Sequence, residues 1–185
     1  MNFAKYRKKS PWILHYNAGG CNGCDIEILA CLGPKYDIER FGMINTGNPK
    51  QSDILLITGP VTKRSRERLV EIYSQMPEPK VVVACGSCTC TGGVFRGMYN
   101  IEGGVDQYVP VDVYVPGCGT RPEQIIAGVA QALEILGQKN KEIEKPLKLF
   151  KKLVFNGSQI NRRSMAGEIE VPEVKKAELK LEEVL

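Results

Sequence analysis

Seven cysteines and a single histidine are the side chains of this sequence best suited to metal or redox chemistry. Because seven is an odd number, the cysteines cannot all pair in disulfides within one chain. Residues 1–20 contain no apolar stretch ahead of a small-residue cleavage site, so we expect no secretion signal and a reducing compartment. Thiols in such a compartment more often bind metals or carry out redox chemistry than form disulfides. The cysteine count therefore predicts a metal or redox centre.

Most of the cysteines come soon after stretches that we predict to be strands. They are Cys21 and Cys24 after residues 12–16, Cys85, Cys88 and Cys90 after residues 80–84, and Cys118 after residues 111–115. In an open parallel sheet, the loops at the carboxyl ends of the strands lie along one edge, where ligands bind. We therefore expect three cysteine loops to converge there. Cys31 falls inside a predicted helix instead, and we expect it to be a small buried hydrophobic residue.

Four converging thiolates could hold either a zinc ion or an iron–sulfur cluster, since both accept four-cysteine sites. Structural zinc sites usually use two short cysteine pairs, whereas the cysteines here are spread over three distant loops. Glycines let the backbone approach a bulky inorganic core and donate N–H groups to its sulfurs. The glycines beside these cysteines are Gly19, Gly20, Gly23, Gly86, Gly92, Gly93, Gly117 and Gly119. The pattern favours an iron–sulfur cluster, with zinc and dithiol chemistry as the alternatives.

Strand-like and helix-like stretches alternate along the chain. The predicted strands are residues 12–16, 38–45, 53–58, 80–84 and 111–115, and the predicted helices are residues 25–32, 62–74 and 120–136. Residues 53–58 are a continuous apolar run, which is typical of a strand buried on both faces of a parallel sheet. Helices of about 12 residues between such strands indicate βαβ units. We expect an α/β fold of the flavodoxin-like kind, a parallel sheet with helices on both faces and the cluster at the carboxyl ends of the strands.

Composition divides the chain of 185 residues into three parts. We expect a basic lead-in at residues 1–10, a flavodoxin-like iron–sulfur domain at 11–140, and an extended C-terminal arm at 141–185. Hydrophobic residues make up 43% and charged residues 25%, as in ordinary globular proteins, and a net charge of +4 is too small to indicate nucleic-acid binding. No stretch approaches the ~18 apolar residues that span a bilayer, so we expect the chain to span no membrane by itself.

Three motifs resemble those of a known family. The sequences C-N-G-C-D-I-E-I at 21–28, G-S-C-T-C-T-G-G at 86–93 and P-G-C-G-T-R-P-E at 116–123 are similar to the cluster-binding motifs of nickel–iron hydrogenase small subunits. The same family includes the 20 kDa (PSST-type) subunit of respiratory complex I. Residues 10–42 in particular resemble the small subunits of the membrane-bound, energy-converting (group 4) hydrogenases. The resemblance extends from residue 10 to about residue 137.

The resemblance implies one 4Fe–4S cluster and selects its ligands. The C-x-x-C of the first motif matches Cys21 and Cys24, whereas complex I relatives carry adjacent cysteines there. The G-x-C-x-x-x-G-G of the second motif selects Cys88, and the P-G-C of the third selects Cys118. One departure is Thr120, which with the glycine before it stands where family members usually have two prolines. Such a loop could expose the cluster, and we expect Thr120 to compensate by capping the helix that follows.

Four further residues could act on the cluster without binding it: Glu27, Cys85, Cys90 and Arg121. The first turn of the predicted helix at 25–32 holds Asp25 and Glu27, and acids there usually offset the positive helix N-terminus. The alternative for Glu27 is an acid beside the cluster or at the large-subunit interface. We expect Cys85 and Cys90 to be inert thiols, the alternative being that one of them modifies the cluster or replaces a ligand.

Two other charged or titratable side chains have an ordinary and a functional interpretation. Arg121 usually would be a surface charge, and the alternative is that it stabilises the negative charge of the cluster. We expect His15, the single histidine, to be a hydrogen-bonded core residue rather than a cofactor ligand or a proton-transfer group. The sequence contains no Walker A loop and no G-x-G-x-x-G after a strand, so no nucleotide site is expected.

Together these features predict an electron-transfer subunit with no catalytic residue of its own. The resemblance implies that it relays electrons between a hydrogenase-type large subunit, which holds nickel and iron, and a ferredoxin-like iron–sulfur subunit. Membrane subunits of the same complex would hold it peripherally on the cytoplasmic side of the cell membrane. Two alternatives remain: a related complex whose large subunit lacks nickel–iron and reduces a quinone or a sulfur compound, and a zinc-stabilised binding module without a redox role.

Overall fold

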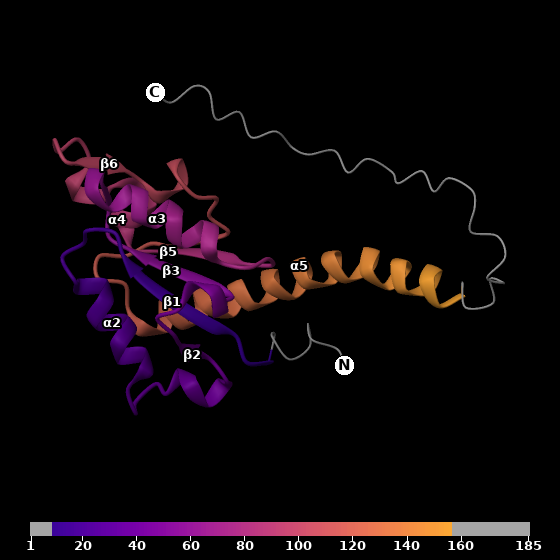
Figure 1. The fold of residues 1–185 in the computed structure, drawn as a ribbon. Helices are drawn as coiled ribbons and strands as arrows, with labels where there is room; N and C mark the ends of the chain where they lie inside the picture. Colours follow the sequence, from indigo (N-terminus) through magenta and orange to yellow (C-terminus); the bar gives the residue numbers. More distant parts are fainter. Residues whose placement is uncertain (1–8, 157–185) are drawn as a thin grey trace, which may run out of the picture. The chain divides into compact units, whose positions relative to one another are not determined.

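A parallel sheet forms the centre of the protein. The computed structural model describes residues 9–156, with side chains described as far as residue 142. The sheet consists of β1 (Trp12–Asn17), β2 (Ile44–Asn45), β3 (Ile54–Thr58), β5 (Val81–Cys85) and β7 (Val113–Val115). Its spatial order is β2-β1-β3-β5-β7, and every pairing is parallel (Figure 1). Counted along the chain, this is the 2-1-3-4-5 order of flavodoxin-like folds, and the predicted fold class is confirmed.

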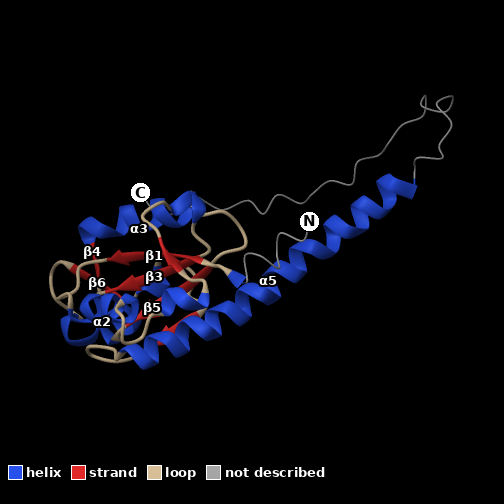
Figure 2. Cartoon of the chain, turned by 90° about the horizontal axis from the view of Figure 1, so that it is seen from below, coloured by secondary structure: helices blue, strands red, loops and turns tan. Residues whose placement is uncertain are grey.

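Helices cover both faces of this sheet, as predicted. Successive side chains of a strand point to opposite faces, and in β3 Ile54 and Leu56 join one apolar cluster while Leu55 and Ile57 join another. The first cluster includes residues of α2 (Gly23–Leu32) and α5 (Pro122–Asn156), and the second includes residues of α3 (Lys63–Gln75). Figure 2 shows the strands enclosed between these helices. All residues of β3 and β5 are buried, in agreement with the continuous apolar runs.

The predicted helix after Thr62 is present as α3 and begins as expected. The Thr62 hydroxyl accepts a hydrogen bond from the backbone N–H of Ser65 at 3.1 Å, and the Ser65 hydroxyl lies 3.0 Å from the backbone nitrogen of Thr62. This reciprocal capping box satisfies N–H groups that have no partner within the helix. Leu69 anchors α3 to the sheet because its side chain is fully buried.

The helix after Cys24 is also present, but its apolar pattern did not identify the buried face. Ile26 and Leu29 are 65% and 60% exposed, and Ile28 and Cys31 face the core instead. Apolar residues occur all around α2, so sequence spacing alone could not select one face. The helix begins at Gly23, two residues before the predicted start.

Two predicted boundaries around the sheet were wrong. Residues 38–45 are not one strand, because Ile38–Phe41 is a 3-10 turn (η1) and only Ile44–Asn45 pairs with β1. Gly42 adopts a φ of +87°, which ends the turn and favours glycine. The cysteine loop at 86–93 contains the short helix α4 (Ser87–Thr91), followed by η3 (Gly93–Phe95).

The last described helix extends further than expected. α5 continues from Pro122 to Asn156, past Leu136 where the predicted helix ended. The chain divides into units at residues 1–148 and 149–185, and of the second unit the structure describes a helical stretch at 149–156. The predicted arm at 141–185 is therefore helical as far as Asn156, and the rest of it lies outside the described residues. The basic residues 1–8 lie outside them as well, and the domain boundaries at 10 and 140 stay predictions.

Smaller elements border the sheet. β4 (Val61–Thr62) pairs antiparallel with β6 (Ile101–Gly103), and η2 (Pro49–Gln51) and η4 (Val105–Gln107) are 3-10 turns. Within residues 9–156, none of the helices is both long and apolar enough to cross a membrane.

Candidate metal centre

The structure brings the four predicted ligands together. Cys21, Cys24, Cys88 and Cys118 all line one hollow at the carboxyl edge of the sheet. Backbone hydrogen bonds hold two of the three cysteine loops together, from the N–H of Gly86 to the Val115 carbonyl and from the N–H of Ser87 to the Gly117 carbonyl, each at 2.8 Å. Because these loops follow β5 and β7, the sheet topology alone brings distant cysteines to one place.

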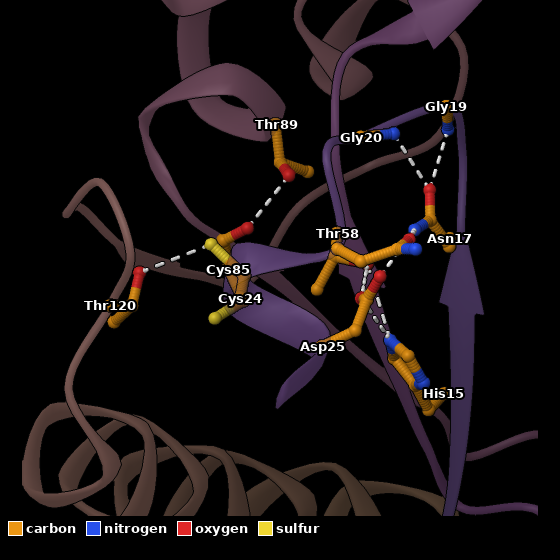
Figure 3. A network of polar contacts seen from close by, with 11 residues as sticks. His15, Asn17, Gly19, Gly20, Cys24, Asp25, Thr58, Cys85, Thr89 and Thr120 are labelled. Carbon is orange, nitrogen blue, oxygen red and sulfur yellow. Dashed lines mark hydrogen bonds and ion pairs between the residues drawn. The ribbon is translucent and has the colours of Figure 1, made fainter. Parts of the chain in front are cut away.

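A polar network fixes the loop that carries Cys21. The Asn17 side-chain oxygen accepts hydrogen bonds from the backbone N–H groups of Gly19 and Gly20 at 2.8 and 2.7 Å (Figure 3). The Asn17 amide nitrogen donates to a carboxylate oxygen of Asp25, the residue after Cys24. One side chain therefore joins the end of β1 to the first turn of α2, on either side of Cys21.

Asp25 is the centre of this network and was missed as a site residue. Its Oδ1 accepts the hydroxyl of Thr58 at the end of β3 and lies 2.9 Å from Nε2 of His15. His15 is hydrogen-bonded, as expected, but it is half-buried and belongs to neither core cluster. The sequence indicated only a first-turn acid at Asp25, because the two strand residues that meet it lie 10 and 33 positions away.

Two glycines of the second cysteine loop lie against ligand sulfurs. Gly86 has a φ of +93°, and a Cβ there would lie 2.8 Å from the Sγ of Cys24. A Cβ at Gly93 would lie 3.0 Å from the Sγ of Cys88. The distance at Gly86 is shorter than real Cβ contacts, and the distance at Gly93 is tight at a φ of +52°, so both positions favour glycine. The close approach of backbone to sulfur is the feature that the glycine-rich loops predicted.

Cys85 and Thr120 both lie beside Cys24. Cys85 is 0% exposed and belongs to the apolar cluster against which Cys24 packs, and the Thr120 hydroxyl lies 3.8 Å from the Sγ of Cys24. Interaction with the Cys85 thiol lowers the pKa of Cys24 most and the groups of Thr120 add to it, against burial, so that this pKa is about 6. The same interaction, together with burial, raises the pKa of Cys85. Cys24 is therefore the thiol of this pair that becomes the thiolate, which is the form that binds metals.

Thr120 does not cap the last helix, contrary to expectation. α5 begins at Pro122, so the residue before its first turn is Arg121, and the Thr120 side chain is directed to Cys24 instead. Proline at the first helical position explains this start, because it needs no hydrogen-bond acceptor there.

The four predicted ligands also affect one another electrostatically. Burial raises the pKa of Cys88, and the charges of Cys118, Cys21 and Cys24 raise it further. Four thiolates around one hollow repel one another unless a cation lies between them. A site of four thiols with glycine backbone beside the sulfurs fits a positively charged iron core bound in the hollow.

The remaining cysteines lie elsewhere. Cys31 is buried at 2% exposure, and its thiol donates to the Glu27 carbonyl at 3.3 Å, in agreement with a packing role. The Cys90 thiol points to the Ala84 carbonyl at 3.7 Å, and the side chain packs on the α3 face of the sheet. The two thiols that flank Cys88 in the sequence therefore have different surroundings.

Glu27 and Arg121, the two charged candidates, differ in burial. Glu27 is half-buried, and its Cγ lies 3.9 Å from the place of a Cβ on Gly119, next to Cys118. Arg121 is exposed directly before α5. In the part of the chain with described side chains, no three His, Cys, Asp or Glu groups meet closely enough to hold a single metal ion. The four thiols surround a hollow instead.

Comparison with protein families gives one match over most of the domain. Residues 21–132 match the family described as "NADH ubiquinone oxidoreductase, 20 Kd subunit", and this range contains all four predicted ligands. The probable membrane-bound hydrogenase subunit mbhJ of Pyrococcus furiosus is 52% identical over 134 residues, which are 72% of this chain and 80% of the relative. A subunit of the NADH-quinone oxidoreductase of Geotalea uraniireducens is 43% identical over 132 residues, 71% and 75% of the two chains.

A solved structure is similar over nearly the whole domain. It is a chain of the membrane-bound sulfane sulfur reductase, an archaeal respiratory membrane complex, with 34% sequence identity and a TM-score of 0.65. The match covers 87% of this chain and 90% of the other.

Proposed function

The chain belongs to the NADH ubiquinone oxidoreductase 20 Kd subunit family, a family of oxidoreductase subunits, and from this premise we propose that it is an electron-relay subunit with one 4Fe–4S cluster. The observation that carries the proposal is the meeting of Cys21, Cys24, Cys88 and Cys118, from three loops, around one hollow. These four thiolates would hold the cluster. When bound, a 4Fe–4S cluster exchanges one electron at a time at a potential that its protein surroundings set.

The other residues of the site would hold the ligands in place. Asn17 and Asp25 fix the loop of Cys21 and the first turn of α2, so the first two ligands are positioned before a cluster binds. Gly86 and Gly93 allow the backbone to lie against the sulfurs of Cys24 and Cys88. None of these groups needs to react, which fits a subunit that passes electrons and leaves catalysis to a partner.

An exposed apolar face beside the site supports a partner subunit. Ile26 and Leu29 lie two and five residues after Cys24, and both are exposed on α2. Exposed apolar patches rimmed by polar residues commonly mark contact surfaces. We propose that a hydrogenase-type large subunit with a nickel–iron site covers this region, and that electrons continue to a ferredoxin-like iron–sulfur subunit. Membrane subunits of the complex would hold the chain peripherally, on the cytoplasmic side.

A second candidate keeps the relay but changes the partner. The similar solved structure comes from a sulfane sulfur reductase, and a similar relative is a subunit of an NADH-quinone oxidoreductase. In this alternative, the large subunit lacks nickel–iron and reduces a sulfur compound or a quinone. Nickel content of the purified native complex distinguishes the two: nickel near one per complex supports the hydrogenase, and its absence with full iron supports the alternative.

Metal and sulfide analysis of the anaerobically purified protein tests the cluster itself. We expect about four irons and four acid-labile sulfides per chain beyond those of any partner, with broad visible absorption. Zinc at one per chain, without labile sulfide or visible absorption, would contradict the relay and support the zinc-stabilised binding module.

A further inference from the structure

The loop at residues 94–100 exposes apolar side chains directly beside the proposed cluster site. Val94 and Tyr99 are 81% and 92% exposed, and Met98 is 50% exposed. The loop follows Gly93, where an added Cβ would lie 3.0 Å from a ligand sulfur. Neighbouring exposed apolar side chains commonly mark a contact surface. The loop is therefore a candidate contact surface next to one of the proposed ligands.

Contacts with α3 and β4 hold the 94–100 loop in place. The Asn100 carbonyl accepts a hydrogen bond from the backbone N–H of Lys63, the first residue of α3, at 3.1 Å. β6, which follows the loop, pairs with β4, and Glu102 of β6 forms an ion pair with Arg66 of α3 at 3.2 Å. The exposed side chains are therefore presented from a backbone that is anchored to the domain.

Positive charge borders the 94–100 loop. Lys63 and Arg64 are exposed at the start of α3, and Arg96 is exposed in the loop itself. None of these three cations forms an ion pair with another of the described residues. The neighbouring exposed acids are Glu67 of α3 and Asp106 of η4, so positive charge is in excess. An apolar centre bordered by unpaired cations fits a partner whose contact surface is bordered by acidic side chains.

The 94–100 loop and α2 lie on different sides of the strand ends. Figure 1 shows α2 on one side of the sheet edge, and β6 with α4 on the other. Residues of α2 belong to the apolar cluster that includes α5, whereas Val105 and Val109, which follow β6, belong to the cluster that includes α3. A relay subunit needs one partner that donates electrons and one that accepts them. Two separate exposed surfaces beside the proposed cluster provide room for both.

We propose that the 94–100 loop and the start of α3 form the docking surface for the second redox partner, an iron–sulfur protein with an acidic rim around an apolar centre. The inference rests on the proposed relay function, which assigns the exposed side of α2 to the large subunit. One electron passes between the two clusters, so that one is oxidised as the other is reduced, and no bond forms or breaks. Burial of Tyr99 and its neighbours would stabilise the contact, and the opposite charges would orient it.

Zero-length cross-linking of the purified native complex tests this surface in the wild-type protein. A carbodiimide joins a lysine amine to a carboxylate that is in direct contact with it. We expect mass spectrometry to find the Lys63 amine joined to an Asp or Glu of an iron–sulfur partner subunit. Cross-links from Lys63 to the large subunit alone, or to no other chain, would overturn the inference.

Variants of exposed residues test the same surface through the stability of the complex. Tyr99→Ser removes the most exposed aromatic side chain of the loop, and Arg96→Glu reverses one of the bordering charges. The matched control is Val70→Ser, because Val70 is 43% exposed on a later turn of α3. Native mass spectrometry measures the complex concentration at which half of the iron–sulfur partner has dissociated. We expect a rise of about tenfold in Tyr99→Ser, and a smaller rise in Arg96→Glu that disappears at high salt.

The large subunit and the cluster of this chain provide the controls for these variants. Tyr99→Ser and Arg96→Glu should keep the large subunit and the paramagnetic signal of this chain, and Leu29→Ser on α2 should weaken the large subunit instead. Unchanged partner binding in Tyr99→Ser and Arg96→Glu, an equal loss in Val70→Ser, or loss of the large subunit from Tyr99→Ser would overturn the inference. A wild-type chain without any cluster would refute the proposed function, so the two failures are distinguishable.

Discussion

The interior of the sheet and its carboxyl edge are built by different means. In the interior, β3 and β5 bury every residue, and aliphatic side chains fill both faces. At the edge, glycines with positive φ, a carboxylate–amide network and exposed or half-buried thiols surround a hollow. Burial of apolar surface dominates folding free energy, whereas the edge residues contribute little of it. The difference teaches that stability and cluster binding should respond to separate sets of substitutions.

The largest expected effect is loss of the cluster, and it separates a cysteine at the edge from a cysteine in the interior. Cys88→Ala removes a proposed ligand at the edge, and we expect visible absorption and labile sulfide of the cluster to disappear. Cys31→Ala removes a buried thiol from the interior face, and we expect the cluster to remain. Both proteins are purified anaerobically and analysed for sulfide per folded chain. Equal cluster loss in the two variants would overturn the ligand assignment.

Shortening a buried side chain in the interior should lower the stability of the fold and leave the cluster in place. Leu55 of β3 is fully buried, and Leu55→Ala leaves a cavity, so we expect the free energy of unfolding to fall by about 2–5 kcal/mol. Iron per folded chain should stay at the wild-type level, because Leu55 faces the α3 side and not the hollow. Urea unfolding under anaerobic conditions and iron analysis of the folded fraction check both parts. Iron loss with unchanged stability would break the proposed separation.

A smaller effect is expected when a glycine at the edge is replaced by alanine. Gly86→Ala forces a side chain into a φ of +93° and places its Cβ 2.8 Å from the Sγ of Cys24. The backbone strain costs about 1–3 kcal/mol, and displacement of Cys24 should reduce iron content and speed cluster loss in air. Gly97→Ala is the matched control, since Gly97 has a φ of +85° with no atom within 4 Å of the added Cβ. Equal iron loss in both variants would assign the effect to backbone strain alone.

Sequence pattern sufficed for the features that depend on local order along the chain. Continuous apolar runs indicated β3 and β5, and cysteines directly after the strands indicated a shared edge, because parallel topology places strand ends together. The sequence also predicted that Thr62 caps α3, because its partner Ser65 is only three residues away. These predictions need no knowledge of which side chains meet across the fold.

The features that sequence analysis missed depend on contacts between distant elements. Cys24 and Cys85 lie on different elements, and only the packing of α2 on the sheet places Cys24 against the apolar cluster that contains Cys85. Asp25 became visible as the centre of a network only when β1 and β3 were placed beside α2. The exposed side of α2 could not be identified because its apolar residues do not fall on a single face. Whether the four cysteines bind iron stays a prediction.

Electron paramagnetic resonance of the reduced protein tests the central claim most directly. A single 4Fe–4S cluster that has accepted one electron has an unpaired spin, so reduction of the native complex should add one spin for this chain, in a one-electron step. Cys88→Ala should remove that signal, and Cys31→Ala should retain it. Wild-type protein that holds zinc, or that shows no signal assignable to this chain at any potential, would contradict the account of an electron-relay subunit.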